Sequence, residues 1–283
     1  MDLLNKLVVA AIPLIPKSIV RVFAGRYIAG ETVPPAELKK VLQDTTQLLV
    51  WDSPVYSSFF QFVRELNQKR PASQRIRVLL GDPPVEYEKV QSQADFRRFN
   101  RDSHFADVVT REVVARGQKA LLISGGAHLW NDLDPQLPIE KQSAGEILRH
   151  RYPGKLFFFW STKLPLPDAK GTGPYALIAK GSHLETTSFA GFCPRLMQRR
   201  VVNGEEKWVR LDELDWPPFI KIAEGLVSYG PAETFVAPNP EIYLDQAYVE
   251  ALRYRNKLYV EGGMPDRSRQ IDAAVQSATK KRP

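Results

Sequence analysis

The sequence predicts an α/β chain whose sheet is mainly parallel and is covered by helices on both faces. Three short apolar runs, 75–80, 120–124 and 155–160, have the composition of buried strands, and segments with helical spacing separate them. A strand that is covered on both faces is apolar along its length, and strands that alternate with helices favour parallel pairing. The prediction adds an irregular Pro/Gly-rich insertion and a small β-hairpin.

Prolines mark the start of two predicted helices near the N-terminus. Pro34 and Pro35 precede a helix over 36–50, and Pro54 precedes a helix over 55–69. Proline suits the first turn of a helix because the N–H that it lacks has no acceptor there. The apolar face of the second helix is expected to hold four residues at helical spacing, Phe59, Phe62, Val63 and Leu66.

A predicted helix over 102–117 ends at a glycine, the residue that most often closes a helix. The strand over 120–124 follows it and leads into Gly125, Gly126 and His128. The two glycines predict a sharp backbone turn that presents the histidine. A helix over 139–152 then leads to the strand over 155–160.

The rest of the chain is predicted to be less regular. Its parts are, in order, the irregular insertion 162–199, a hairpin over 200–211, a strand over 219–229, a helix over 245–260 and a disordered tail over 261–283. The hairpin prediction rests on Asn203-Gly204, a dipeptide that fits a tight two-residue turn. One α/β domain is therefore expected over 26–260, after a poorly specified segment over 1–25.

Composition and charge limit the classes of function. Hydrophobic residues make up 43% of the 283 residues and charged residues 25%, as in ordinary globular proteins. The net charge of +7 is scattered along the chain without a recognition motif, so nucleic-acid binding is not expected. The single cysteine, Cys193, excludes an internal disulfide and a zinc site built on cysteines, and it suits a reducing compartment.

The apolar run 7–15 has two alternative interpretations. It resembles the apolar core of a signal peptide, but Asp2 precedes it and Pro13 and Pro16 interrupt it. It is also much shorter than the roughly 20 apolar residues of a membrane helix. We expect a cytoplasmic protein that does not enter a membrane, with an exported form as the alternative.

Five polar residues are predicted to meet at one edge of the sheet. Asp82 and His128 each follow a strand, and Arg101, Asp102 and His104 open the helix that comes after the first of these loops. Ligands of parallel α/β sheets collect at the carboxyl ends of the strands, so these side chains form a candidate site. A purely structural alternative stands beside it, in which Asp82 forms a turn and Asp102 is the cap or the first-turn acid of its helix, with Arg101 as the surface ion partner of Asp102.

Three segments also carry a family resemblance. The runs 76-IRVLLGDPP-84, 101-RDSHFADVVTREV-113 and 119-KALLISGGAHL-129 resemble the C-terminal half of the erythromycin esterase-like superfamily, which includes ChaN-like and TraB/TIKI-related proteins. The stretch that begins at 26-RYIAGETVP-34 is similar to a group of uncharacterised bacterial proteins within it. The resemblance covers about residues 26–152, with fainter similarity at 226–234 and 241–256.

The resemblance implies hydrolysis of a small ester or lactone by a water molecule that a histidine activates as general base. It implies that Arg101, Asp102 and His128 are the catalytic residues; Phe105 stands where the esterase pattern usually has Met. Asp82 and His104, which are predicted at the same edge of the sheet, are expected to bind substrate. A small-molecule substrate is the expected partner, and no cofactor or metal is assigned.

One half of the esterase site has no counterpart in this sequence. The chain contains no G-E-x-x-H motif, and the segment 7–23, where a glutamate-bearing strand is expected, contains no acidic residue. The chain is therefore either a truncated member of the superfamily or a paralogue without its chemistry. Two alternatives to a hydrolase remain open, a non-catalytic scaffold and a protein that binds haem or a metal through His104, His128 and Asp82.

Overall fold

The computed structural model describes residues 7–12, 18–43, 46–83, 85–97, 100–130, 138–162, 174–192, 197–202, 205–210, 216–228 and 240–280. The chain divides into two compact units. Residues 1–124 and 235–283 make up the first, and residues 125–234 make up the second. The first unit thus contains both ends of the chain, whereas the sequence predicted one domain over 26–260.

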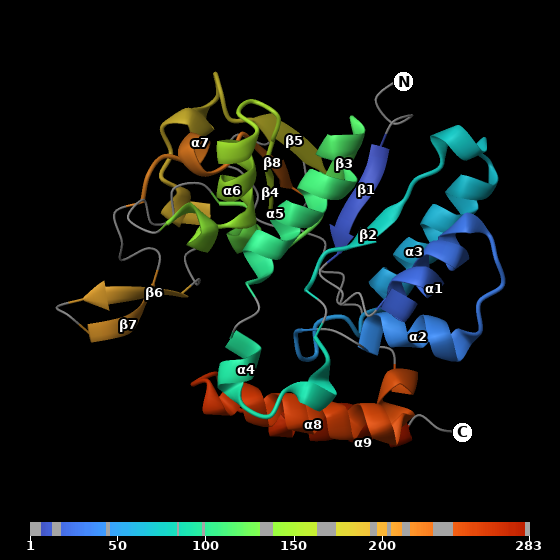
Figure 1. The fold of residues 1–283 in the computed structure, drawn as a ribbon. Coiled ribbons are helices and arrows are strands. Elements are labelled where there is room, and N and C mark those ends of the chain that lie inside the picture. Colours follow the sequence, from blue (N-terminus) through green and yellow to red (C-terminus); the bar gives the residue numbers. More distant parts are fainter. Residues whose placement is uncertain are drawn as a thin grey trace. The chain divides into compact units, whose positions relative to one another are not determined.

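The first unit is built on a three-stranded parallel sheet in the order β2-β1-β3. Its strands are β1 (Leu7–Ile12), β2 (Val78–Leu80) and β3 (Lys119–Leu122), and Figure 1 shows β1 between the other two. The segment over 1–25, which the sequence left unspecified, therefore supplies the central strand. Its prolines do not interrupt this strand, because β1 ends immediately before Pro13.

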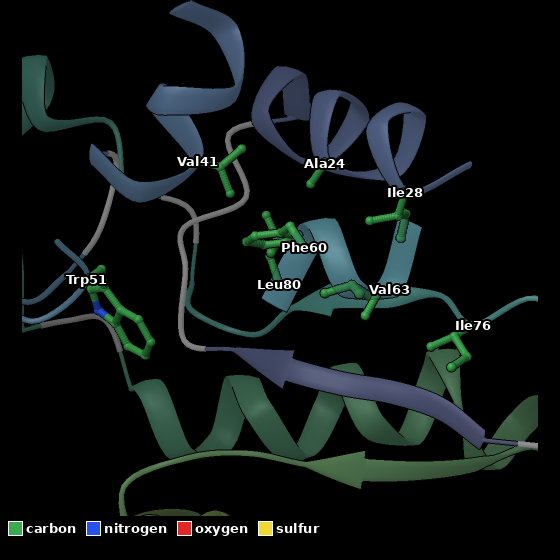
Figure 2. Close-up of a cluster of buried hydrophobic side chains, with 9 residues drawn as sticks. Ala24, Ile28, Val41, Trp51, Phe60, Val63, Ile76 and Leu80 are labelled. Carbon is green, nitrogen blue, oxygen red and sulfur yellow. The ribbon is translucent and has the colours of Figure 1, made fainter. Parts of the chain in front are cut away.

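Helices α1 (Ser18–Ala29), α2 (Pro35–Gln43) and α3 (Pro54–Gln68) contribute to a buried cluster with β2. Figure 2 shows Ala24, Ile28, Val41, Phe60 and Val63 of these helices around Leu80 of β2. Residues of a strand point alternately to its two faces. Val78 and Leu80 belong to this cluster, whereas Leu79 packs in a separate cluster with Val108 and Val113. Both faces of β2 are therefore covered.

Helix α3 confirms the predicted helix over 55–69, but not all of its apolar face. Val63 is 1% exposed and Phe60 is 2% exposed, while the side chain of Phe62 is 60% exposed. Helix α2 ends at Gln43, although its periodicity predicted a helix to residue 50. Thr46 and Leu48, which the prediction placed in this helix, are both buried, and Leu48 lies in a cluster with residues of the C-terminal segment.

Helix α5 (Arg101–Glu112) positions most of the candidate site residues. The side chain of Asn100 caps it by accepting a hydrogen bond from the Ser103 N–H over 3.1 Å. A 3-10 turn over Val114–Arg116 follows, and Gly117 closes it with φ of 62°, in the left-handed region that favours glycine. The predicted helix over 102–117 is thus an α-helix followed by a 3-10 turn.

The C-terminal segment forms two helices, α8 (Gln246–Glu261) and α9 (Ser268–Lys280), which lie side by side (Figure 1). The short helix α4 (Gln93–Arg97) packs against α8. Helix α8 agrees with the helix predicted over 245–260. Helix α9 lies where the sequence predicted a disordered tail over 261–283. Its Ile271 is fully buried in a cluster with Tyr248, Val249 and Leu252, so burial of apolar side chains stabilises a segment that is polar on average.

The second unit contains a mixed sheet in the order β4-β8-β5 and a separate hairpin. Its elements are α6 (Ala144–Arg151), β4 (Phe159–Thr162), β5 (Tyr175–Ile178), α7 (Phe219–Ile222), β8 (Gly225–Ser228) and the hairpin strands β6 (Met197–Val202) and β7 (Glu205–Arg210). β8 is parallel to β4 and antiparallel to β5.

The predicted elements of this unit agree with the structure in part. The antiparallel pairing of β6 and β7 agrees with the predicted hairpin, although Asn203 and Gly204 lie outside the described residues. The predicted strand over 219–229 is the helix α7 followed by β8. The predicted irregular insertion over 162–199 contains β5 and the start of β6. The mixed α/β class is confirmed.

Candidate functional site

Asp82 lies two residues after the end of β2, next to Gly81, and its side chain is completely buried. Its Oδ1 accepts a hydrogen bond from the Nε of Arg101 over 2.9 Å, and its Oδ2 accepts one from the hydroxyl of Thr46. A buried carboxylate is stable only when it is paired or hydrogen-bonded. The alternative in which Asp82 serves only as a turn former is therefore wrong, since its side chain binds residues from two other segments.

Arg101 is the first residue of α5, and its side chain is 22% exposed. Its guanidinium forms the ion pair with Asp82 and also lies over the ring of Phe105, 5.6 Å from the ring centroid. The Nη2 atom is buried, and it has no hydrogen-bond partner among the residues that the structure describes. The sequence suggested Asp102 as the surface partner of Arg101, but the arginine pairs with Asp82.

Thr46 and Tyr259 extend this cluster toward the C-terminal helices. The hydroxyl of Tyr259, in α8, donates a hydrogen bond to the backbone carbonyl of Thr46, whose own hydroxyl binds Asp82. Burial raises the pKa of the Tyr259 hydroxyl, and the nearby positive charge of Arg101 opposes this effect. Tyr259, Thr46, Asp82 and Arg101 therefore form one chain of contacts within the first unit.

His104 lies one turn after Arg101 on the same helix and is half-buried. Residues three apart are neighbours on a helix surface, so its ring and the Arg101 side chain share one face of α5. Burial lowers the pKa of His104, and the positive charge of Arg111 lowers it further, against the opposing effects of Asp107 and Asp82. Its Nε2 atom is buried without a hydrogen-bond partner in the described part of the chain.

Asp102 occupies the first turn of α5, where a negative charge interacts favourably with the helix dipole. The structural alternative for Asp102, the cap or the first-turn acid of this helix, agrees with the structure in its second form, because the side chain of Asn100 accepts the capping hydrogen bond. Asp102 thus follows the cap by two positions and precedes the half-buried His104 by two. A catalytic role for Asp102 stays a prediction.

His128 belongs to the second unit, at the end of a 3-10 turn over Gly126–His128. Its convergence with the four residues of the first unit therefore stays a prediction. The second glycine before it has a packing role within the second unit. A Cβ atom on Gly126 would lie 2.0 Å from Cζ3 of Trp160, so only glycine fits against this indole. The sequence had attributed this glycine to a turn that presents the histidine.

Several residues of the cluster escaped the sequence-based prediction. Thr46 was placed inside a helix that in fact ends at Gln43, and Tyr259 was one of several aromatic residues on a predicted C-terminal helix. Neither position has a motif that distinguishes it. Only the faint family similarity over 241–256 pointed to the neighbourhood of Tyr259.

The described residues give no support to a metal centre. Within the ranges that the structure describes, no three His, Cys, Asp or Glu side chains are grouped so that they could hold a metal ion. Both carboxylate oxygens of Asp82 already accept hydrogen bonds, one from Arg101 and one from Thr46.

Comparison with known proteins gives no relative. No protein-family model matches the chain, and neither a curated protein nor a solved structure matches it. Among the described residues, no helix is both long enough and apolar enough to cross a membrane.

Proposed function

We propose that this chain is a hydrolase of the erythromycin esterase-like type, which acts on a small ester or lactone in the cytoplasm. In this proposal His128, Asp102 and Arg101 take the catalytic roles that the family resemblance implies, and Asp82 and His104 bind the substrate. The mainly parallel sheet with helices on both faces is part of the same proposal, because the superfamily resemblance and the covered faces of β2 both favour it.

The observation that carries the proposal is the pair of buried nitrogens, Nη2 of Arg101 and Nε2 of His104, neither of which has a partner in the described segments. A buried polar atom without a partner costs about 1–3 kcal/mol. Such groups in native proteins call for an explanation, and a ligand that binds them is one. An ester carbonyl oxygen accepts a hydrogen bond from a guanidinium, and this bond strengthens when the oxygen becomes negative during hydrolysis.

The charge state of His104 supports the same chemistry. Because burial and Arg111 lower its pKa, the imidazole is neutral at pH 7. A neutral imidazole can accept a proton from a water molecule or hold that water for another base. Asp82 keeps the Arg101 guanidinium in a fixed orientation through the 2.9 Å hydrogen bond, so the arginine can bind the substrate without reorganising.

Turnover of p-nitrophenyl acetate and of a series of small lactones tests this proposal. Arg101→Lys and His128→Ala should each lower kcat/KM by at least about 100-fold, the usual loss when a general base or an oxyanion donor is removed. His104→Ala should raise KM and shift the pH profile. His150→Ala is the matched control, since His150 is an exposed histidine on α6.

Two results would contradict the hydrolase proposal, and a third would invalidate the assay. Wild-type protein without turnover of any ester or lactone would favour the non-catalytic scaffold. Full activity of the His128→Ala variant would show that His128 is not the general base that the family resemblance implies. Equal losses in the His150→Ala control would mean that the assay does not report on this site.

A further inference from the structure

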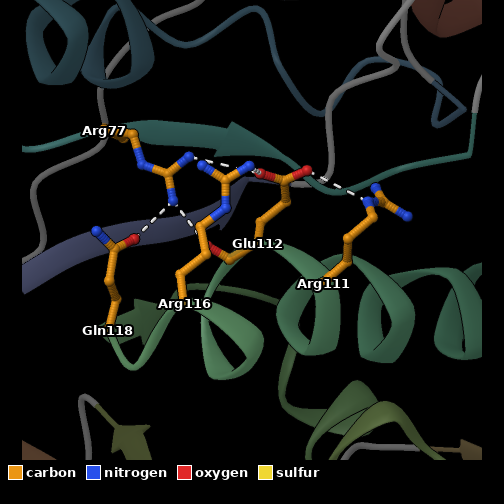
Figure 3. A network of polar contacts seen from close by, with 5 residues as sticks. All are labelled: Arg77, Arg111, Glu112, Arg116 and Gln118. Atoms are coloured by element: carbon orange, nitrogen blue, oxygen red, sulfur yellow. Dashed lines mark hydrogen bonds and ion pairs between the residues drawn. The ribbon is translucent and has the colours of Figure 1, made fainter.

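A second cluster of charged side chains lies at the other end of α5. Glu112, the last residue of this helix, has a side chain only 8% exposed, and its carboxylate contacts three arginines. Arg77 comes from the segment before β2, Arg111 from α5 and Arg116 from the 3-10 turn after it. Figure 3 shows the guanidinium groups of Arg77 and Arg116 together on one side of this carboxylate and Arg111 on the other.

The distances show how the carboxylate holds this arrangement. Oε2 of Glu112 lies 2.9 Å from Nη2 of Arg116 and 3.5 Å from Nη1 of Arg77, and Oε1 lies 3.2 Å from Nε of Arg111. Arg77 is fixed further, because its Nη2 donates to the backbone carbonyl of Glu112 over 2.7 Å and to Oε1 of Gln118 over 2.8 Å. Two guanidinium groups thus share one carboxylate oxygen.

The charges of this cluster do not balance. Three guanidinium groups carry three positive charges and Glu112 supplies one negative charge, which leaves two positive charges uncompensated within the cluster. The side chains of Arg111 and Arg116 are 58% and 53% exposed, so they reach solvent, whereas the carboxylate that orients them does not. Arg111 directs its Nε toward Glu112, and Arg116 directs its Nη2 toward the same carboxylate. A guanidinium group has five N–H donors in all, so each arginine has further donors beyond the atom that faces Glu112.

We propose that Arg77, Arg111 and Arg116 form a binding site for a phosphate monoester, with Glu112 as the positioning residue. A phosphate monoester carries close to two negative charges at pH 7, which matches the two positive charges that the cluster leaves uncompensated. Its three oxygens accept paired hydrogen bonds from a planar guanidinium, and Arg116 is placed to donate them because one edge of its fork is held by Glu112. This site shares no residue with the Asp82–Arg101–His104 cluster, and the proposal does not rest on the hydrolase activity.

Calorimetric titration of the full chain with phenyl phosphate tests the site, with benzoate as the matched probe. The two molecules share a ring and differ in their anionic groups, a doubly charged phosphate and a singly charged carboxylate. Phenyl phosphate should bind at least about tenfold more tightly than benzoate. Arg116→Gln should weaken its binding about tenfold or more, the loss expected for one charge-assisted hydrogen bond. Arg253→Gln, an exposed arginine of α8 that pairs with Asp272, should leave the affinity unchanged.

Glu112→Gln separates an oriented site from simple charge attraction. This variant raises the net charge of the cluster to +3 but removes the carboxylate that holds the guanidinium groups. Weaker binding of phenyl phosphate supports the proposal, and unchanged or tighter binding overturns it. Equal affinity for benzoate, or full binding by Arg116→Gln, overturns it as well. If a single-stranded oligonucleotide binds far more tightly than phenyl phosphate and loses this binding in Arg116→Gln, the partner is a nucleic acid and the monoester proposal fails.

Discussion

Arg101 donates a hydrogen bond from Nε to Oδ1 of the fully buried Asp82 over 2.9 Å. The two residues are 19 positions apart, and they join the loop after β2 to the first turn of α5. A buried ion pair gives little net stability compared with apolar residues, but breaking it by removing one partner is costly. This pair therefore fixes the geometry of the candidate site more than it stabilises the fold.

Asp82→Asn should lower the free energy of unfolding by about 3 kcal/mol, because the Arg101 guanidinium would lose its charge partner. Urea denaturation followed by circular dichroism measures this change. Arg253→Gln on the exposed Arg253–Asp272 pair provides the comparison, since exposed ion pairs contribute under about 1 kcal/mol. If Asp82→Asn were as stable as this control, the pair would not be structurally important.

Tyr259→Phe should cost about 1 kcal/mol of stability and should also change the candidate site. The variant removes only the hydroxyl that donates to the Thr46 carbonyl, and Thr46 in turn donates to Asp82. Because neighbouring members of one hydrogen-bond network couple, the costs of Tyr259→Phe and Thr46→Val should not add. A double-mutant cycle in urea measures the coupling, and strictly additive costs would mean that the two contacts act separately.

Acidification should destabilise the protein partly through His104. The folded protein holds the pKa of His104 below its ordinary value, mainly through burial. Below about pH 6.5 the unfolded chain therefore binds a proton that the folded chain does not, and stability falls as the pH decreases toward the folded pKa. Above about pH 6.5 the ring is neutral in both states and contributes no pH dependence.

The measurement is the free energy of unfolding of wild type and His104→Gln between about pH 5 and 8. The wild type should lose more stability than the variant below about pH 6.5, and the two curves should run parallel above it. His150→Gln serves as the control because His150 is exposed on α6, and it should follow the wild-type curve. An identical acid loss in His104→Gln would rule out His104 as the source.

The candidate site could be predicted in part because strand ends and helix starts leave local patterns in a sequence. Asp82 after an apolar run and Arg101 at the start of a helix were identified in this way, and the structure brings these two together. Thr46 and Tyr259 left no such pattern, since their roles depend on contacts across 36 and 213 positions of the chain. Long-range hydrogen bonds of single polar residues have no periodicity to detect.

The errors in the predicted fold have the same origin. The run 7–12 was apolar enough to be a strand, but the prolines after it suggested an interrupted segment, and only its pairing with β2 and β3 makes it central. Helix α9 has few apolar residues, so composition favoured a disordered tail. Helix α9 packs against residues of α8 because its few apolar residues lie on one side of the helix. Composition alone does not contain this positional information.

Ile271→Ala tests whether α9 is an integral part of the first unit. Ile271 is fully buried beside Tyr248 and Leu252, so the variant should lose about 3 kcal/mol of stability from lost burial and a residual cavity. Gln276→Ala, at an exposed position of the same helix, should change the stability by less than about 0.5 kcal/mol. Equal stability of both variants would mean that α9 does not dock in solution.

Gly126→Ala should disturb the aromatic packing of the second unit. The added methyl group would lie 2.0 Å from Cζ3 of Trp160, whose ring is packed 5.8 Å from Trp130 and 5.2 Å from Phe189 between centroids. An indole held among other rings has no free space to yield, so the variant should lose about 1–3 kcal/mol of stability. The near-ultraviolet dichroism of the tryptophans should weaken in the same variant.

Gly191→Ala is the control for this prediction. No atom lies within 4 Å of a Cβ built on Gly191, so this variant should keep both its stability and its aromatic spectrum. A Gly126→Ala protein with an unchanged tryptophan spectrum would show that this indole can move aside. Glycine before His128 would then be required by the turn rather than by Trp160, as the sequence had first suggested.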